Sequence, residues 1–375
     1  MEVTVDVVVF ALGAVAALGT LGSAVRTVVL PRGIPARLSS LVFVVLGRVY
    51  RLRIRRTATY ERRDRVMAGF APAALMLLVV EWLTITLAGY TAMFWAIGAR
   101  PLRAAVTDSG SSLTTLGFSQ PRDLPSVLLA FTEAGLGLTL LALLITYLPS
   151  LYSAFSRREA AVALLEVRAG SPPFGVAMLE RYSRIGWLGG LSAIWDQWET
   201  WFVEVEESHT SFAALAFFRS PQPDHSWITA AGAVLDAAAL SSSTLLERDP
   251  DANICVRAGY VALRRIADFY DIPYDQDPAP DDPISVAREE YDEAYDRLAA
   301  AGMELVPDRD QGWRDFAGWR VNYDVVLITL CALFQAPYAP WSSDRSVAPY
   351  RVRILRRGRR RGPARRSAGP PAREA

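Results

Sequence analysis

The residues best suited to chemistry form one uninterrupted string between two long apolar runs. The string consists of Thr114, Thr115, Leu116, Gly117, Phe118 and Ser119. Backbone carbonyls and threonine hydroxyls are the groups that replace the water shell of a monovalent cation in a selective pore. Gly117 permits the positive φ that turns neighbouring carbonyls to one side. We therefore expect these six residues to form the ion-selectivity filter of a re-entrant pore loop.

The apolar runs on either side of the string are long enough to cross a bilayer, which takes about 20 apolar residues. They predict a second membrane span over residues 70–97 and a third over residues 125–148. Between them, residues 102–114 predict a short helix, whose negative C-terminal end would point at a bound cation. The alternative interpretation of the region is a Thr- and Gly-rich hairpin that merely links two packed membrane helices.

Three residues of the third span are expected to support or gate the pore: Glu133, Gly135 and Gly137. Glycine in a membrane helix permits bending or close packing, so Gly135 or Gly137 is expected near a gate. A carboxylate inside a membrane is costly unless it faces protein, water or a partner. We expect Glu133 to accept hydrogen bonds from hydroxyls behind the filter rather than to bind an ion directly.

The order of span, short helix, Thr-x-Gly-aromatic string and span resembles the pore module of bacterial two-transmembrane potassium channels over residues 70–155. That family's filter usually reads Thr-x-Gly-aromatic-Gly, and a Glu and then a Gly recur in its inner helix. The resemblance implies potassium ions in the pore and, because a pore ring needs about four loops, a homotetramer. Ser119 replaces the family's second glycine, and Gln120 follows it. Single-glycine filters resemble those of Trk and Ktr potassium transporters, so selectivity for potassium over sodium stays open.

The arginines predict how the chain is oriented in the membrane. Residues 1–30 form the first span, and residues 31–69 form an Arg-rich linker, which the positive-inside rule places in the cytoplasm. Within the linker, Leu41 to Leu46 is too short to span and indicates an interfacial helix. Arg157 and Arg158 mark the inner end of the third span. We expect an N-terminus outside and a C-terminus in the cytoplasm of a bacterium, with the protein in its inner (plasma) membrane.

The first span carries Glu2 and Asp6 at its start and its arginines behind it. A cleaved signal peptide has a basic start and a cleavage site, so a retained anchor is the expected interpretation.

The rest of the chain predicts a mainly helical cytosolic domain over residues 156–340 and a disordered basic tail over residues 341–375. The fold class is thus an all-α membrane protein with three transmembrane helices, a re-entrant pore loop and a cytosolic C-terminal domain. The chain has two cysteines, Cys255 and Cys331, without CxxC spacing, so neither a disulfide framework nor a zinc site is implied. Helices are expected over residues 160–167, 176–187, 193–207, 228–247, 254–270, 284–302 and 313–334.

The predicted cytosolic domain offers few residues for catalysis or metal binding. Glu206 and His209 have the i, i+3 spacing of di-iron helices, but such sites need a second Glu-x-x-His, which the chain lacks. The pair is either a metal-site candidate or part of a polar cluster that fixes a turn. Trp195, Trp198 and Phe202 share one helical face and are expected to form core. We predict no enzyme activity and no cofactor besides the potassium ion.

These patterns predict a potassium-type cation channel with a regulatory cytosolic domain. The expected partners are membrane lipids and other copies of the chain, with no specific nucleic acid and with room for an unidentified cytosolic ligand. The main alternative is a non-conducting membrane-anchored sensor or scaffold with a degenerate channel module. Ser119, in place of the second glycine, favours this alternative. A second alternative is an enzyme that uses Glu206, His209 and Asp236 close to the membrane.

Overall fold

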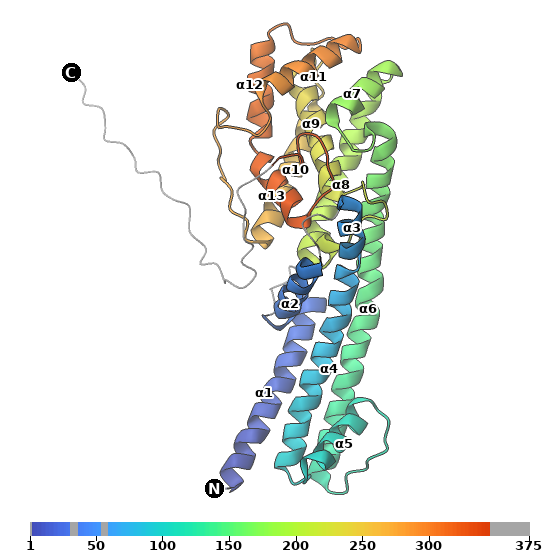
Figure 1. The fold of residues 1–375 in the computed structure, drawn as a ribbon, viewed down its shortest axis with the longest axis vertical. Coiled ribbons are helices and arrows are strands. Elements are labelled where there is room, and N and C mark those ends of the chain that lie inside the picture. Colours follow the sequence, from blue (N-terminus) through green and yellow to red (C-terminus); the bar gives the residue numbers. More distant parts are fainter. Residues whose placement is uncertain (1, 31–36, 54–58, 346–375) are drawn as a thin grey trace, which may run out of the picture.

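The computed structural model describes residues 2–30, 37–53 and 59–345, and the regular elements in these ranges are helices (Figure 1). The N-terminal half contains α1 (Glu2–Val28), α2 (Arg37–Arg53), α3 (Tyr60–Ala68), α4 (Phe70–Ala96), α5 (Leu102–Leu113) and α6 (Leu124–Ala169). The C-terminal half contains α7 (Gly175–Arg184), η1 (Leu188–Gly190), α8 (Leu191–Ser211), η2 (Leu215–Phe217), α9 (Trp227–Ser243), α10 (Pro250–Phe269), α11 (Arg288–Ala300), α12 (Arg309–Arg320) and α13 (Asp324–Phe334).

Three helical segments are long and apolar enough to cross a membrane: Val3–Val28, Tyr60–Ala96 and Leu124–Ala169. The three predicted spans are confirmed at this level, and the chain is a membrane protein by length and composition. α12 and α13 meet the same criterion only as a pair that is bent by 54°. α13 is buried in the core of the C-terminal half.

The three long helices lie side by side as a rod, with α7 to α13 gathered around one end of it (Figure 1). α1 and α4 approach closely through glycine. A Cβ on Gly89 would lie 2.8 Å from the backbone oxygen of Gly13, so the two backbones touch where neither residue has a side chain. Small residues at such crossings let membrane helices pack through their backbones.

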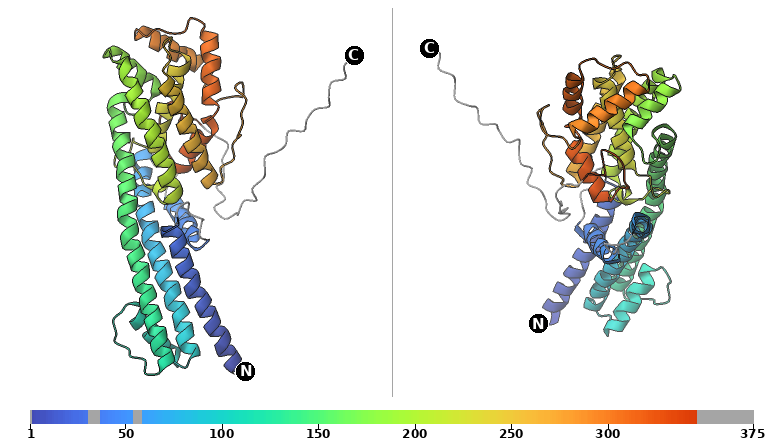
Figure 2. Two further views of the ribbon diagram at one scale, coloured as in Figure 1. Left: turned by 180° about the vertical axis from the view of Figure 1, so that it is seen from behind. Right: turned by 45° about the horizontal axis from the view of Figure 1, so that its top comes forward.

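The helix of the third span is far longer than predicted. α6 runs through Pro149, Arg157 and Arg158 to Ala169, so residues 160–167 are helical as predicted but are the last part of α6. At 1.5 Å per residue its 46 residues reach about 69 Å, roughly twice the hydrocarbon thickness of a bilayer. The second half of α6 therefore lies along the C-terminal half of the chain (Figure 2).

α2 is longer than the predicted interfacial segment and packs where the rod meets the C-terminal half. The Phe43 ring centroid lies 6.2 Å from that of Phe70 and 6.1 Å from that of Phe217. On another side of α2, apolar residues at helical spacing are exposed, namely Leu41, Val45, Val49 and Leu52. One face thus packs on protein and another is apolar and uncovered.

The C-terminal half is built around one hydrophobic core. Trp195, Trp198 and Phe202 of α8 are buried in it, which confirms their prediction as core. The helix predicted over residues 313–334 is instead two helices, α12 and α13. Trp341 is also buried, so the tail does not begin at residue 341 as predicted. Residues 346–375 lie outside the described part of the chain.

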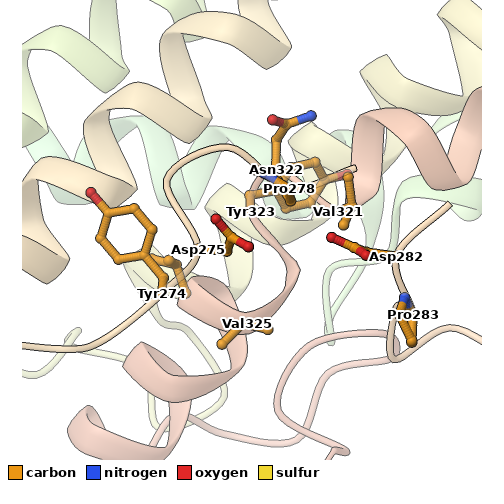
Figure 3. Close-up of a pocket in the computed structure, with 10 residues that line it drawn as sticks. Tyr274, Asp275, Pro278, Asp282, Pro283, Val321, Asn322, Tyr323 and Val325 are labelled. Atoms are coloured by element: carbon orange, nitrogen blue, oxygen red, sulfur yellow. The ribbon is translucent and has the colours of Figure 1, made fainter. Parts of the chain in front are cut away.

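The acidic, proline-rich stretch between α10 and α11 runs past the junction of α12 and α13. It borders a small cavity of about 110 Å³, which Asp275 and Asp282 line together with Tyr274 (Figure 3). The opposite side of this cavity is formed by Val321, Asn322 and Tyr323.

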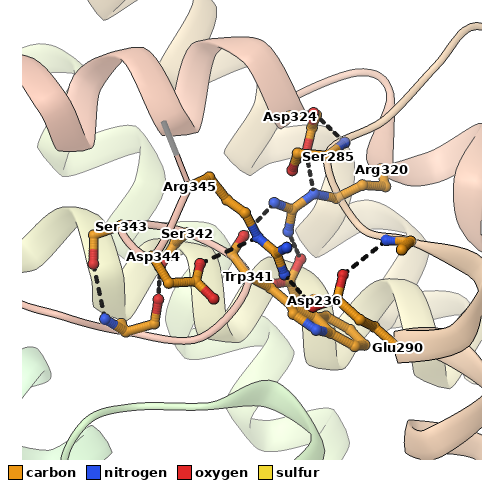
Figure 4. Close-up of polar contacts among 12 residues, drawn as sticks. Asp236, Ser285, Glu290, Arg320, Asp324, Trp341, Ser342, Ser343, Asp344 and Arg345 are labelled. Atoms are coloured by element: carbon orange, nitrogen blue, oxygen red, sulfur yellow. Dashed lines mark hydrogen bonds and ion pairs between the residues drawn. The ribbon is translucent and has the colours of Figure 1, made fainter. Parts of the chain in front are cut away.

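A buried arginine ties the segment around Trp341 to the core (Figure 4). The fully buried Arg320 forms ion pairs with Asp236 of α9 and Asp324 of α13, and it donates to the Trp341 backbone oxygen. The Tyr323 hydroxyl donates to Asp236 over 2.9 Å, and the Ser285 hydroxyl donates to Asp324 over 2.6 Å. Burial raises the pKa of Asp236, and Arg320 and then Tyr323 oppose that shift. Each buried carboxylate thus has charged or polar partners.

Arg320→Met is expected to lower the free energy of unfolding by about 3–5 kcal/mol, because it leaves two buried carboxylates without their counter-charge. The measurement is denaturant unfolding of the full chain in detergent, followed by tryptophan fluorescence. Arg248→Met is the matched control, since Arg248 is half exposed and pairs with Asp315 at the surface over 3.0 Å. It should cost less than about 1 kcal/mol. Equal losses of unfolding free energy in both variants would show that the buried ion pairs of Arg320 stabilise the protein no more than a surface ion pair does.

Candidate functional site

The predicted short helix, α5, lies in a slot between α4 and α6. Its Ser109 is fully buried, and the hydroxyl lies 3.1 Å from the Leu87 backbone oxygen of α4 and 2.6 Å from Glu133 Oε1 of α6. The last residue of α5, Leu113, lies beside Gly137, more than three turns beyond the start of α6. α5 therefore runs from the end of the rod toward its middle, and the chain returns to the start of α6 through residues 114–123.

The two glycines expected near a gate have different surroundings. A Cβ on Gly137 would lie 2.7 Å from the Leu113 backbone oxygen, so the absence of a side chain lets α6 touch the end of α5. A Cβ on Gly135 would meet nothing within 4 Å. Gly137 thus allows α6 to pack closely against the end of α5, whereas Gly135 lies on an open face of α6.

Glu133 is fully buried and contacts the helix that precedes the Thr114–Ser119 loop. One carboxylate oxygen accepts the hydrogen bond from Ser109, and the other, Oε2, has no hydrogen-bond partner among the described residues. Nearby in α4, the Tyr90 hydroxyl donates to Thr132 Oγ1 over 3.3 Å. The carboxylate therefore helps to hold α5 in its slot.

The loop itself turns its N–H groups back toward α5. The N–H of Thr115 donates to the Ser112 oxygen and that of Leu116 to the Ser111 oxygen, each over 3.0 Å. Thr115 has φ 54° and Gly117 has φ 70°, so the chain reverses through two left-handed residues. The carbonyls of residues 114–118 accept no hydrogen bond from the described residues. Five successive carbonyl oxygens are thus free to bind another group.

Ser119, at the end of the loop, is held by its side chain. Its hydroxyl donates to Asp108, and its N–H donates to Ser111 Oγ over 3.0 Å. Asp108 and Ser111 lie one helical turn apart on α5, and their contacts with Ser119 were not predicted. Their i, i+3 spacing on the predicted helix was the available signal.

Apolar side chains around the loop are uncovered in the single chain. Leu116 is 69 % exposed and Phe118 is 64 % exposed. An exposed apolar stripe also follows α6 at helical spacing through Leu128, Phe131, Leu138 and Ile145. A surface of this kind needs lipid or protein to cover it.

The two metal-site candidates of the C-terminal half have different partners. Glu206 forms an ion pair with Arg265 over 2.8 Å, whereas His209 is buried against Arg158. No group of three or more His, Cys, Asp or Glu side chains that could hold a metal occurs in the described part of the chain. Asp236 belongs to the Arg320 cluster, so Glu206, His209 and Asp236 do not converge on one site.

His209 instead helps to anchor α6 in the C-terminal half. The Arg158 guanidinium donates to the Leu215 and Phe218 backbone oxygens and lies 3.2 Å from His209 Nε2. Because arginine only donates, Nε2 is the unprotonated acceptor, and Nδ1–H donates to the Val205 oxygen over 2.9 Å. Burial, and next the facing Arg158 charge, hold the pKa of His209 well below its usual range.

The chain matches no family model, no curated protein and no solved structure. Its function is therefore inferred from the geometry of the Thr114–Ser119 loop and from the helices that hold it.

Gly137→Ala is expected to destabilise the protein by about 1–3 kcal/mol, because the added methyl group collides with the backbone at the end of α5. Gly135→Ala adds the same group in open space and should be neutral or slightly stabilising. Denaturant unfolding of the full chain in detergent compares the two variants. Similar free energies for both would contradict the close contact between α5 and α6.

A neutral buried His209 predicts a loss of stability in acid. Because its folded pKa lies below the unfolded value, its contribution is fully present above about pH 6.5 and is lost as the pH falls below that value. The free energy of unfolding should fall by about 1 kcal/mol from this group between pH 6.5 and 5.5. His209→Gln should be less stable at pH 7.5 but less sensitive to pH. A pH dependence of His209→Gln that equals that of the wild type would contradict the assignment.

Proposed function

We propose that the protein is a potassium-type cation channel that conducts passively through a tetrameric pore, with the Thr114–Ser119 loop as its filter. The observation that carries this proposal is the run of five free carbonyls at the end of a helix buried between two candidate spans. Rings of such carbonyls replace the water shell of potassium in selective pores.

The depth of the loop supports a water-filled pore. Gly137, beside the end of α5, lies 13 residues (137 − 124) beyond the first residue of α6, or about 20 Å at 1.5 Å per residue. A loop at that depth lies within a hydrocarbon layer of about 30 Å. Irregular backbone is tolerated there only if it is buried in protein or lines a water-filled cavity. Four copies around a pore satisfy this requirement for the free carbonyls.

Electrostatics and surface character support the same assembly. The C-terminal end of α5 points its partial negative charge toward the loop, which favours a cation there. The exposed apolar stripe of α6, with Leu116 and Phe118, provides the surface that other copies and lipid would cover. One loop per chain requires about four chains to complete a ring.

The arginines and the fold support one orientation. The N-terminus of α1 and the loop lie at one end of the rod, and the Arg-rich segment around α2 and α3 lies toward the other (Figure 1). The positive-inside rule then assigns the N-terminus and filter to the outside of the plasma membrane and the C-terminal half to the cytoplasm. There, α7 to α13 would regulate the pore through α6, which Arg158 anchors among them.

Ser119 favours the second candidate function, a non-conducting membrane-anchored sensor or scaffold. Its hydroxyl is tied to Asp108, so the position where the related filters have a second glycine is held by a side chain. Native mass of the purified protein separates the two candidates, because a monomer cannot close a pore and a tetramer can.

The decisive measurement is potassium flux into vesicles that contain the reconstituted full chain. Gly117→Ala is expected to abolish flux, because alanine disfavours the φ of 70° that Gly117 adopts. Nothing lies within 4 Å of a Cβ at this position, so a loss would report the backbone conformation and not a collision.

Gly22→Ala is the matched control, since Gly22 lies in α1 with open space around it, and its flux should equal that of the wild type. Flux that persists in Gly117→Ala would remove the loop from the pore. A wild-type protein that conducts no monovalent cation would overturn the channel proposal in favour of the scaffold.

A further inference from the structure

A cavity of about 220 Å³ lies between α3, which leads into the second candidate span, and the C-terminal half. Tyr60, Arg63 and Asp64 line it from α3, and Arg219, Gln335 and Arg345 line it from the other side. Three arginines thus face one cavity, and Asp64 is the single carboxylate among its lining residues. No part of the proposed pore uses this site.

The partners of these arginines show where free positive charge remains. Arg345 is neutralised by carboxylates that do not line the cavity: it pairs with Glu290 over 2.6 Å and lies 3.2 Å from Asp344 (Figure 4). Arg219 lies 3.4 Å from Asp64 and donates to the Gln335 backbone oxygen over 2.8 Å. Arg63 forms no ion pair with any described residue and is exposed. Among the lining residues the arginines thus outnumber the carboxylates, three against one, and Arg63 is the lining arginine that pairs with no carboxylate of the described residues.

The cavity beside the α12–α13 junction has the opposite character. It is half as large, and its charged lining residues are Asp275 and Asp282 (Figure 3). The surplus of arginine is thus a property of the α3 cavity and not of cavities in this chain generally.

We propose that the α3 cavity binds a single phosphate group, either as a free phosphate ion or as the phosphate of a lipid headgroup. Arg63 and Arg219 supply forked guanidinium donors, which match phosphate oxygens in geometry and charge. Pockets for drug-sized ligands have about 300–1,000 Å³, so this cavity is too small for a nucleotide and suits one phosphate group. The proposal does not depend on conduction by the pore.

A phosphate in this cavity would bridge α3 and the C-terminal half. Arg219 ends the segment Phe212–Arg219, which packs against the rod helices at several points. The Phe217 ring centroid lies 5.5 Å from that of Phe70 in α4, and the Phe212 centroid lies 5.5 Å from that of Tyr147 in α6. A ligand held by both Arg63 and Arg219 would therefore stabilise the junction between the two halves.

The test uses the full chain in nanodiscs of phosphatidylcholine, with inorganic phosphate as the probe. Binding to the folded state should raise the unfolding temperature as phosphate is added. Arg63→Ala is expected to weaken phosphate binding about tenfold, because it removes a charged donor. Arg62→Ala is the matched control, since Arg62 is exposed on the same helix and does not line the cavity. It should bind phosphate as the wild type does.

Asp64→Asn separates binding from a structural effect. It removes the carboxylate that competes for Arg219, so phosphate should bind about fivefold more tightly, even where the variant is less stable without the ligand. A role of these residues in packing alone would give no such gain.

A second arm distinguishes the two sources of phosphate. Nanodiscs that contain phosphatidate should abolish the response to inorganic phosphate if a lipid headgroup occupies the site, and should leave it unchanged if the site takes free phosphate; both results support the proposal. Two results overturn it. One is that neither inorganic phosphate nor phosphatidate stabilises the wild type, and the other is that Arg62→Ala and Arg63→Ala weaken binding equally.

Discussion

In the proposed membrane placement, backbone carbonyls at the depth of the hydrocarbon layer need a donor, water or a cation, and this requirement would constrain the whole N-terminal half. α5 meets it for its own backbone by forming a helix, and α4 and α6 bury that helix. The hydrogen bond between Ser109 and Glu133 fixes which face of α5 packs against α6, and Gly137 allows the end of α5 to touch α6. What remains is the short stretch after α5, where polar backbone is left uncovered in one chain. The surrounding helices can be understood as the supports that hold this stretch in place.

The structure joins that stretch to the C-terminal half without a flexible linker. α6 is continuous from the return of the loop to Ala169, and the buried Arg158 fastens it to backbone oxygens of the Leu215–Phe218 segment. The same segment contacts α2, α4 and α6 through aromatic rings. Changes in the C-terminal half therefore have a direct structural route to the helix that packs against α5.

The sequence sufficed for those features that depend on neighbours along the chain. Apolar runs located the three candidate spans, and helical spacing placed Trp195 in the core. The length of α6 could not be predicted, because Pro149 and Arg158 look like the end of a span. The buried partners of Arg158 lie more than 50 residues away in the sequence. The Arg320 cluster was missed for the same reason, since Asp236 is 84 residues distant. The Thr114–Ser119 loop was located from its residue types, but the contact between Ser119 and Asp108 was not.

The length of α6 has a mechanical consequence. A straight helix acts as a lever, and a tilt of about 5° displaces one end of a 69 Å rod by about 6 Å relative to the other. That displacement exceeds the rise of one helical turn, about 5.4 Å. For a rotation about Arg158 the lever to Gly137, where α6 touches α5, is about 32 Å, so the same 5° tilt would move that contact by about 3 Å.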